Sequence, residues 1–100
     1  MRTEHEIYID FSRAKEQAAK LRSIASGMDR IANDELAGTL RAIQNDWTGD
    51  NADKFNEKGV QVQHKINLTA ADISRIADAV EEIAQRMYDT EMAAIQIAAT

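Results

Sequence analysis

A sustained repeat of apolar and small residues over the second half of the chain most constrains its fold. From Ala52 to Met87 these residues recur in alternating steps of three and four. The run consists of Ala52, Phe55, Gly59, Val62, Ile66, Thr69, Ile73, Ile76, Val80, Ile83 and Met87. A repeat of about 3.5 residues places them on one side of a helix and is typical of left-handed helix packing. It predicts a helix over about residues 51–95.

The first half of the chain follows the same rule with one interruption. Its repeat consists of Ala14, Ala18, Leu21, Ala25, Met28 and Ala32, followed by Leu36, Leu40 and Ile43 in steps of four, four and three. These three steps add up to eleven and resemble an eleven-residue repeat, which we expect to straighten the supercoil locally. The pattern predicts a helix over about residues 11–46. Asp10 and Ser12 are candidates for its N-cap, and residues 1–10 read as irregular.

One compact turn signal, residues 47–50, separates the two helices. The chain has no proline, so nothing in the composition breaks a long helix elsewhere. Gly49 permits the positive φ or the close backbone contact that a reversal of direction requires, and Asp50 and Asp53 favour the start of the next helix. Because the connection is short, the helices must be antiparallel neighbours. We therefore expect a single all-α domain over residues 1–100, an antiparallel two-helix hairpin.

The turn also predicts a register, in which residues whose numbers sum to about 97 lie at one level. The level pairs are then Ile66 with Ile31, Ile73 with Ile24, and Ile76 with Leu21. Gly59 falls level with Gly38, and two readings stay open for this pair. Either the helices approach closely there, or the glycines are placed by chance.

The apolar stripes are wider than one helix–helix seam requires. Three apolar positions per heptad suit a bundle in which each helix contacts two others. We therefore expect a second hairpin to complete a four-helix bundle dimer. The predicted helix–helix or dimer interface consists of Leu21, Ile24, Met28, Ile31, Leu36, Leu40, Ile43, Phe55, Val62, Ile66, Ile73, Ile76, Val80 and Ile83.

Composition argues against several classes of function. The net charge is −5 and no basic cluster occurs, which disfavours nucleic acid as a partner. The chain has no cysteine, and its two histidines, His5 and His64, lie far apart, so we expect no metal and no cofactor. No phosphate-binding loop or nucleophile–base motif occurs, and we expect no enzyme activity. Trp47 either anchors the end of the hairpin or docks on a partner, and the structural role is the favoured one.

The motif Trp47-Thr48-Gly49, placed between two long heptad helices, resembles the WXG (ESAT-like) family. These small proteins are handled by type VII secretion in Gram-positive bacteria and mycobacteria. The resemblance implies a protein that is cytoplasmic before export and is then secreted without a cleaved signal peptide. It implies pairing with itself, with a related helical hairpin, or with the helical N-terminal region of a toxin. It also implies recognition by a secretion ATPase.

Members of that family carry a C-terminal export signal. The form with Tyr, three residues, and then Asp or Glu is not met, because Met92 stands at that spacing from Tyr88. A looser form, with one acidic and three hydrophobic positions, is met by Met87, Glu91, Ala94 and Ala98. In the predicted register, residues beyond Met87 extend past the start of the first helix. They then either present a recognition surface or form a fraying helix end.

Two other functions fit the same stripes. The first is a membrane-active amphipathic protein, although the polar face is acidic rather than lysine-rich. The second is an intracellular coiled-coil scaffold in which the Trp-x-Gly motif is coincidental. Leakage of dye from anionic vesicles would favour the first, and an absence of neighbouring secretion genes would favour the second.

Overall fold

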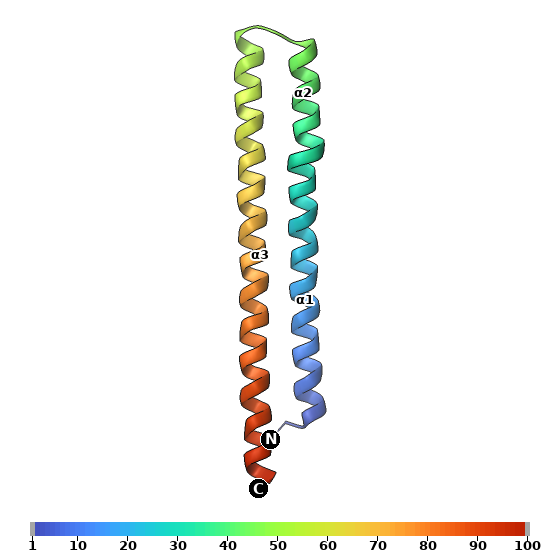
Figure 1. The fold of residues 1–100 in the computed structure, drawn as a ribbon, viewed down its shortest axis with the longest axis vertical. Helices are drawn as coiled ribbons and strands as arrows, with labels where there is room; N and C mark the ends of the chain where they lie inside the picture. The colour runs from blue at the N-terminus through green and yellow to red at the C-terminus, as the bar shows by residue number, and fades with distance from the viewer. Residues whose placement is uncertain (1, 100) are drawn as a thin grey trace. The chain divides into compact units, whose positions relative to one another are not determined.

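The computed structural model describes residues 2–99, and the terminal residues 1 and 100 of the predicted domain lie outside it. In the described part every regular element is helical, as predicted (Figure 1). The elements are α1 (Glu4–Arg30), the π-helix η1 (Ile31–Leu36), α2 (Ala37–Asp46) and α3 (Asp50–Ala99). Contacts group them into two units. We call residues 23–73 the tip unit, and residues 2–22 with 74–99 the terminal unit.

The first helix begins at Glu4, rather than near residue 11 as the sequence pattern predicted. Thr3 caps it, because the hydroxyl of Thr3 accepts a 3.1 Å hydrogen bond from the amide of Glu6 and donates a 3.2 Å bond to its carboxylate. Thr and Glu at this spacing form a capping box. The predicted caps, Asp10 and Ser12, therefore lie inside α1.

The change in the spacing of apolar residues before the turn coincides with η1. We call α1, η1 and α2 together the first helical arm. Ala18, Ala25 and Ala32 are buried at intervals of seven residues, and the next buried residue of that arm, Leu40, follows eight residues after Ala32. The amide of Ala37 donates to the carbonyl of Ala32, five residues earlier. This wide turn takes up the extra residue, so Leu40 returns to the side that carries Ala32. The interruption was predicted in the right place, and a π-helix accommodates the extra residue.

The turn between α2 and α3 has the backbone that the sequence predicted. Trp47 is extended, with φ −135° and ψ 125°, and its amide donates a 2.8 Å hydrogen bond to the carbonyl of Ile43. Gly49 has φ +113°, the one positive φ among residues 2–99. The amide of Asp53 then donates a 3.0 Å hydrogen bond to the carbonyl of Gly49, which starts α3. An L-residue at position 49 would be strained in this conformation.

In the tip unit α2 and α3 approach each other closely at Gly59. A Cβ at Gly59 would lie 2.9 Å from Cδ1 of Leu40 and closer still to Cδ2. Gly38 takes no part in this approach, because the nearest atom to a Cβ at Gly38 is a guanidinium nitrogen of Arg41 on the same helix, 3.8 Å away. Of the two readings for the glycine pair, close approach therefore holds at Gly59 alone.

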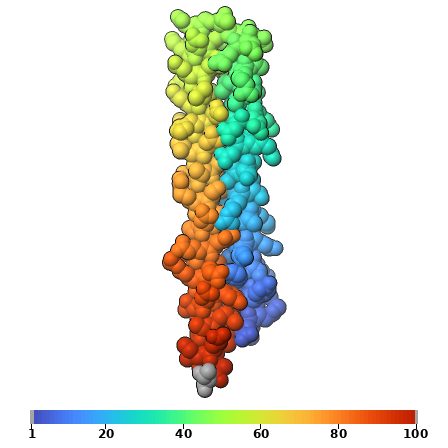
Figure 2. All heavy atoms as spheres, viewed as in Figure 1, coloured from blue at the N-terminus to red at the C-terminus, as the bar shows by residue number. Residues whose placement is uncertain are grey.

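The buried cores of both units are built largely from small side chains. The buried apolar residues are Ile7, Ala18, Ala25, Ala32, Leu40, Ala52, Ala70, Ala77 and Ala84. Within each unit the atoms of the two arms lie against one another, as the face in Figure 2 shows. Alanine allows this close approach because its side chain ends at Cβ. The large aliphatic side chains are therefore displaced to the flanks of the seam.

Candidate interaction surface

Exposed isoleucines precede four of the buried alanines. The alanines are 0–9% exposed, whereas the isoleucines are 46–56% exposed. The four pairs are Ile24-Ala25, Ile31-Ala32, Ile76-Ala77 and Ile83-Ala84. Consecutive residues of a helix are rotated by about 100°, so each isoleucine lies beside the seam rather than in it.

These isoleucines lie on a definite side of each unit. Antiparallel helices are related by a twofold axis perpendicular to their common plane, so equivalent positions on the two arms share one face. In the tip unit, Ile24 and Ile31 therefore share a face with Val62, which is 49% exposed. In the terminal unit, Ile76 and Ile83 lie on one side of α3. Met87, 54% exposed, follows Ile83 by one helical turn. We call these side chains the aliphatic flank of the unit to which they belong.

The opposite side of the terminal unit is polar. Arg22 on α1 donates hydrogen bonds to Asp78 at 2.8 Å and to Glu81 at 2.5 Å, both on α3. The hydrogen bond from Arg22 lowers the pKa of Glu81 below its ordinary value of 4.5, and the same bond raises the pKa of Arg22. The three side chains are partly exposed, so solvent screens the interaction. The charged groups of these three side chains are therefore already paired within the unit.

The tip unit has a matching polar side. The side-chain carbonyl of Asn33, within η1, accepts hydrogen bonds from Asn67 at 3.0 Å and from Gln63 at 3.5 Å. Both donors are on α3. Each unit therefore has one flank of amides or charges that bond across the seam, and one flank of aliphatic side chains without such partners.

Trp47 and Phe55 form a third apolar patch at the turn. Their ring centroids are 5.9 Å apart and the rings are tilted by 54°. Both residues are 46% exposed. They line a shallow, mainly apolar notch together with Ile43 and Ala42. Trp47 thus packs on the start of α3 and also presents about half of its surface, so both predicted roles remain open.

The residues of the predicted export signal have unequal surroundings. Met87 is more than half exposed, and Ala94 and Ala98 are exposed on α3. Glu91, however, accepts a 3.1 Å hydrogen bond from Arg2. The prediction that everything beyond Met87 extends past the first arm is therefore wrong, because α1 begins earlier than predicted and Arg2 reaches Glu91.

The predicted interface residues divide into three groups by exposure. Leu40 is buried. The half-buried members are Leu21, Met28, Leu36, Ile43, Ile66, Ile73 and Val80. The exposed members are Ile24, Ile31, Phe55, Val62, Ile76 and Ile83. On α3 three buried alanines, Ala70, Ala77 and Ala84, each follow a residue of the predicted repeat by one position, whereas Ala52 is buried as that repeat predicted. The Ile-Ala dipeptides were the sequence signal for this shift.

Within residues 2–99, no group of three or more His, Cys, Asp or Glu side chains is arranged to hold a metal ion. None of the described helices combines the length and apolar character needed to cross a membrane. Comparison of the chain with protein-family models, curated proteins and solved structures finds no match.

Proposed function

We propose that this chain acts without catalysis, by pairing the aliphatic flank of each unit with another helical hairpin to form a four-helix bundle. The observation that carries the proposal is the set of four isoleucines, each about half exposed and each next to a buried alanine. The partner is a second copy of the chain or a related hairpin, since either presents the same kind of surface.

Burial of the flank supplies the stabilisation for such pairing. Fully burying an isoleucine contributes about 1.5–3 kcal/mol, so covering the exposed half of each contributes roughly 1 kcal/mol. Several such side chains on each partner are needed to offset the cost of association. The flank provides Ile24, Ile31 and Val62 in the tip unit and Ile76, Ile83 and Met87 in the terminal unit.

The polar side of each unit limits the number of chains that such an assembly contains. In the terminal unit the carboxylates of Asp78 and Glu81 are engaged by Arg22, and in the tip unit Asn33 is engaged by Asn67. A second apolar contact on that side would have to desolvate these groups. Pairing through one flank alone gives a closed, twofold assembly rather than an open filament.

The biological setting follows from the resemblance. The motif Trp47-Thr48-Gly49 stands at the turn between two long helical arms, the arrangement that resembles the WXG family. We therefore assign the chain as a substrate or co-secreted partner of type VII secretion. Its partner would be itself, a related hairpin, or the helical region of a larger exported protein.

Secretion from the native host tests this setting. Deleting residues 87–100 should abolish export, and circular dichroism of the purified variant should show that most of the helix content remains. A matched variant, Leu68→Ala, changes an exposed apolar residue of α3 outside the flank and should be exported normally. Normal export of the truncated chain would refute the tail as an export signal.

A further inference from the structure

Near its two chain ends the terminal unit contains a small apolar pocket. The first turns of α1 contribute Ile7, Phe11 and Ala14, and the last part of α3 contributes Met87 and Tyr88. The rings of Phe11 and Tyr88 have centroids 4.7 Å apart. The pocket has a volume of about 120 Å³. An apolar cavity of about 150 Å³ holds a benzene molecule, so this one accommodates part or all of a single apolar side chain.

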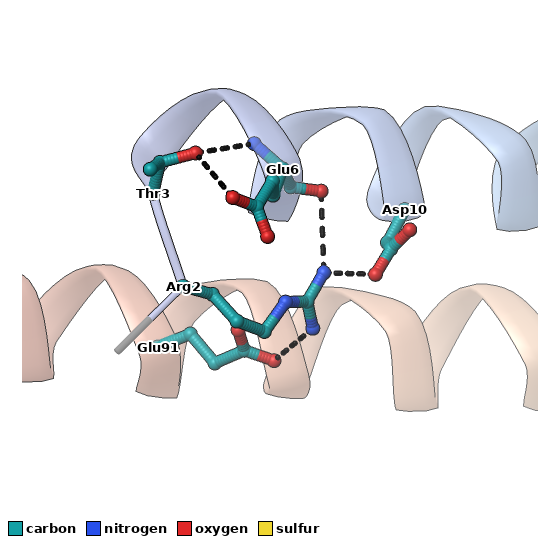
Figure 3. A network of polar contacts seen from close by, with 5 residues as sticks. All are labelled: Arg2, Thr3, Glu6, Asp10 and Glu91. Atoms are coloured by element: carbon teal, nitrogen blue, oxygen red, sulfur yellow. Dashed lines mark hydrogen bonds and ion pairs between the residues drawn. The ribbon is translucent and has the colours of Figure 1, made fainter.

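Arg2 is one of the residues that line this pocket. It contacts three acceptors, as Figure 3 shows. Its guanidinium donates to Glu91 on α3 at 3.1 Å, to the carboxylate of Asp10 on α1, and to the carbonyl of Glu6 at 3.2 Å. Two carboxylates and a carbonyl from two helices therefore converge on one guanidinium. This geometry matches the several donors that a guanidinium presents in a fixed plane.

The ion pairs that hold Arg2 at that position are partly exposed. Arg2 precedes Thr3, the cap of α1, so its backbone is not part of the helix. The side chains of Arg2, Asp10 and Glu91 are 39%, 58% and 27% exposed. Ion pairs at this level of exposure hold a side chain only weakly. Another guanidinium can therefore replace Arg2 at small cost.

From this arrangement we infer a second docking site, which shares Met87 with the aliphatic flank but is otherwise built from other residues. It takes a protein segment that presents an arginine beside one large apolar side chain. The arginine replaces Arg2 between Asp10 and Glu91, and the apolar side chain enters the pocket beside Phe11 and Tyr88. In the free chain Arg2 fills the charged half of the site. The inference does not depend on pairing or on secretion, since it rests on contacts inside the terminal unit.

Titration with a dipeptide tests the site directly. Acetyl-Arg-Leu-amide is added to the isotope-labelled full-length protein, and proton–nitrogen correlation spectra are recorded. We expect saturable shifts at the amides of Phe11, Met87, Tyr88 and Glu91. Acetyl-Gln-Leu-amide, which lacks the guanidinium, should produce none. Shifts that do not saturate, or equal shifts with both peptides, would overturn the inference.

Variants separate displacement of Arg2 from general surface binding. Arg2→Gln should bind acetyl-Arg-Leu-amide up to about fivefold more tightly than the wild-type protein. This factor corresponds to the roughly 1 kcal/mol of one exposed ion pair. Adding Glu91→Gln should remove the binding, whereas Glu82→Gln, which removes an exposed acid bonded to Arg86 outside the pocket, should not. If the peptide bound equally well to the variants carrying Glu91→Gln and Glu82→Gln, the proposed docking site would be wrong. The wild-type titration remains informative if a variant loses helix content.

Discussion

The side chain of Leu40 occupies the space that a Cβ at Gly59 would need. Leu40 is 7% exposed, so it has little freedom to move away. A glycine inside a helix ordinarily costs about 1 kcal/mol relative to alanine. At this position the cost is offset by the contact between α2 and α3 that the missing side chain allows.

Replacing Gly59 with alanine should therefore destabilise the protein, although the same change stabilises most helices. We expect the free energy of unfolding to fall by about 1–3 kcal/mol, because Leu40 must leave its position. Urea denaturation followed by circular dichroism measures the change. Gly38→Ala is the matched control, since a Cβ there meets no atom closer than 3.8 Å. The free energy of unfolding of Gly38→Ala should rise by up to about 1 kcal/mol. Equal effects at the two positions would contradict the contact.

Asn56 provides a test of the buried polar group in the tip unit. It is 7% exposed, and its side-chain oxygen has no hydrogen-bond partner in the described part of the chain. An unsatisfied buried acceptor costs about 1–3 kcal/mol. Asn56→Leu should therefore raise the free energy of unfolding by about that amount. Asn51→Leu, an exposed position on the same helix, should change it little. A loss of stability in Asn56→Leu would show that the oxygen is satisfied in solution.

The bond between Arg22 and Glu81 should make stability depend on pH. Because the pKa of Glu81 is lowered in the folded state, its contribution is present above the unfolded-state pKa, near 4.5. It is lost as the pH falls through the lower folded-state value. Arg22→Ala should thus be less stable than wild type at neutral pH, and the difference should shrink on acidification below pH 4.5. Urea denaturation at several pH values measures this. A constant difference across the range would exclude the linkage.

Much of the fold could be predicted from the sequence. The heptad spacing and the turn at Gly49 predicted two helices and their connection, because periodicity and a required positive φ are local properties. The start of α1 could also have been predicted, since Thr3 and Glu6 have the spacing of a capping box. The apolar repeat, however, starts only at Ala14, so the repeat alone places the start of the helix too late.

The phase of the seam was harder to predict. The largest apolar residues, such as Ile76 and Ile83, were expected inside, yet the neighbouring alanines are buried instead. Hydrophobicity alone does not distinguish residues packed between the two helices of a hairpin from apolar residues exposed on its surface. The contact between Arg2 and Glu91 joins residues 89 positions apart, so it required the register and the true helix start.

Sedimentation equilibrium of flank variants tests the central claim most directly. Ile76→Glu combined with Ile83→Glu places two charges on the aliphatic flank, whereas Leu68→Glu combined with Val60→Glu alters exposed apolar residues of α3 outside it. We predict that the wild-type chain and the control form pairs of twice the 11.2 kDa chain mass, or a one-to-one pair with a co-produced related hairpin. The flank variant should remain a monomer. A flank variant that still pairs would contradict the account. A wild-type chain that stays monomeric both alone and with a co-produced related hairpin would contradict it as well.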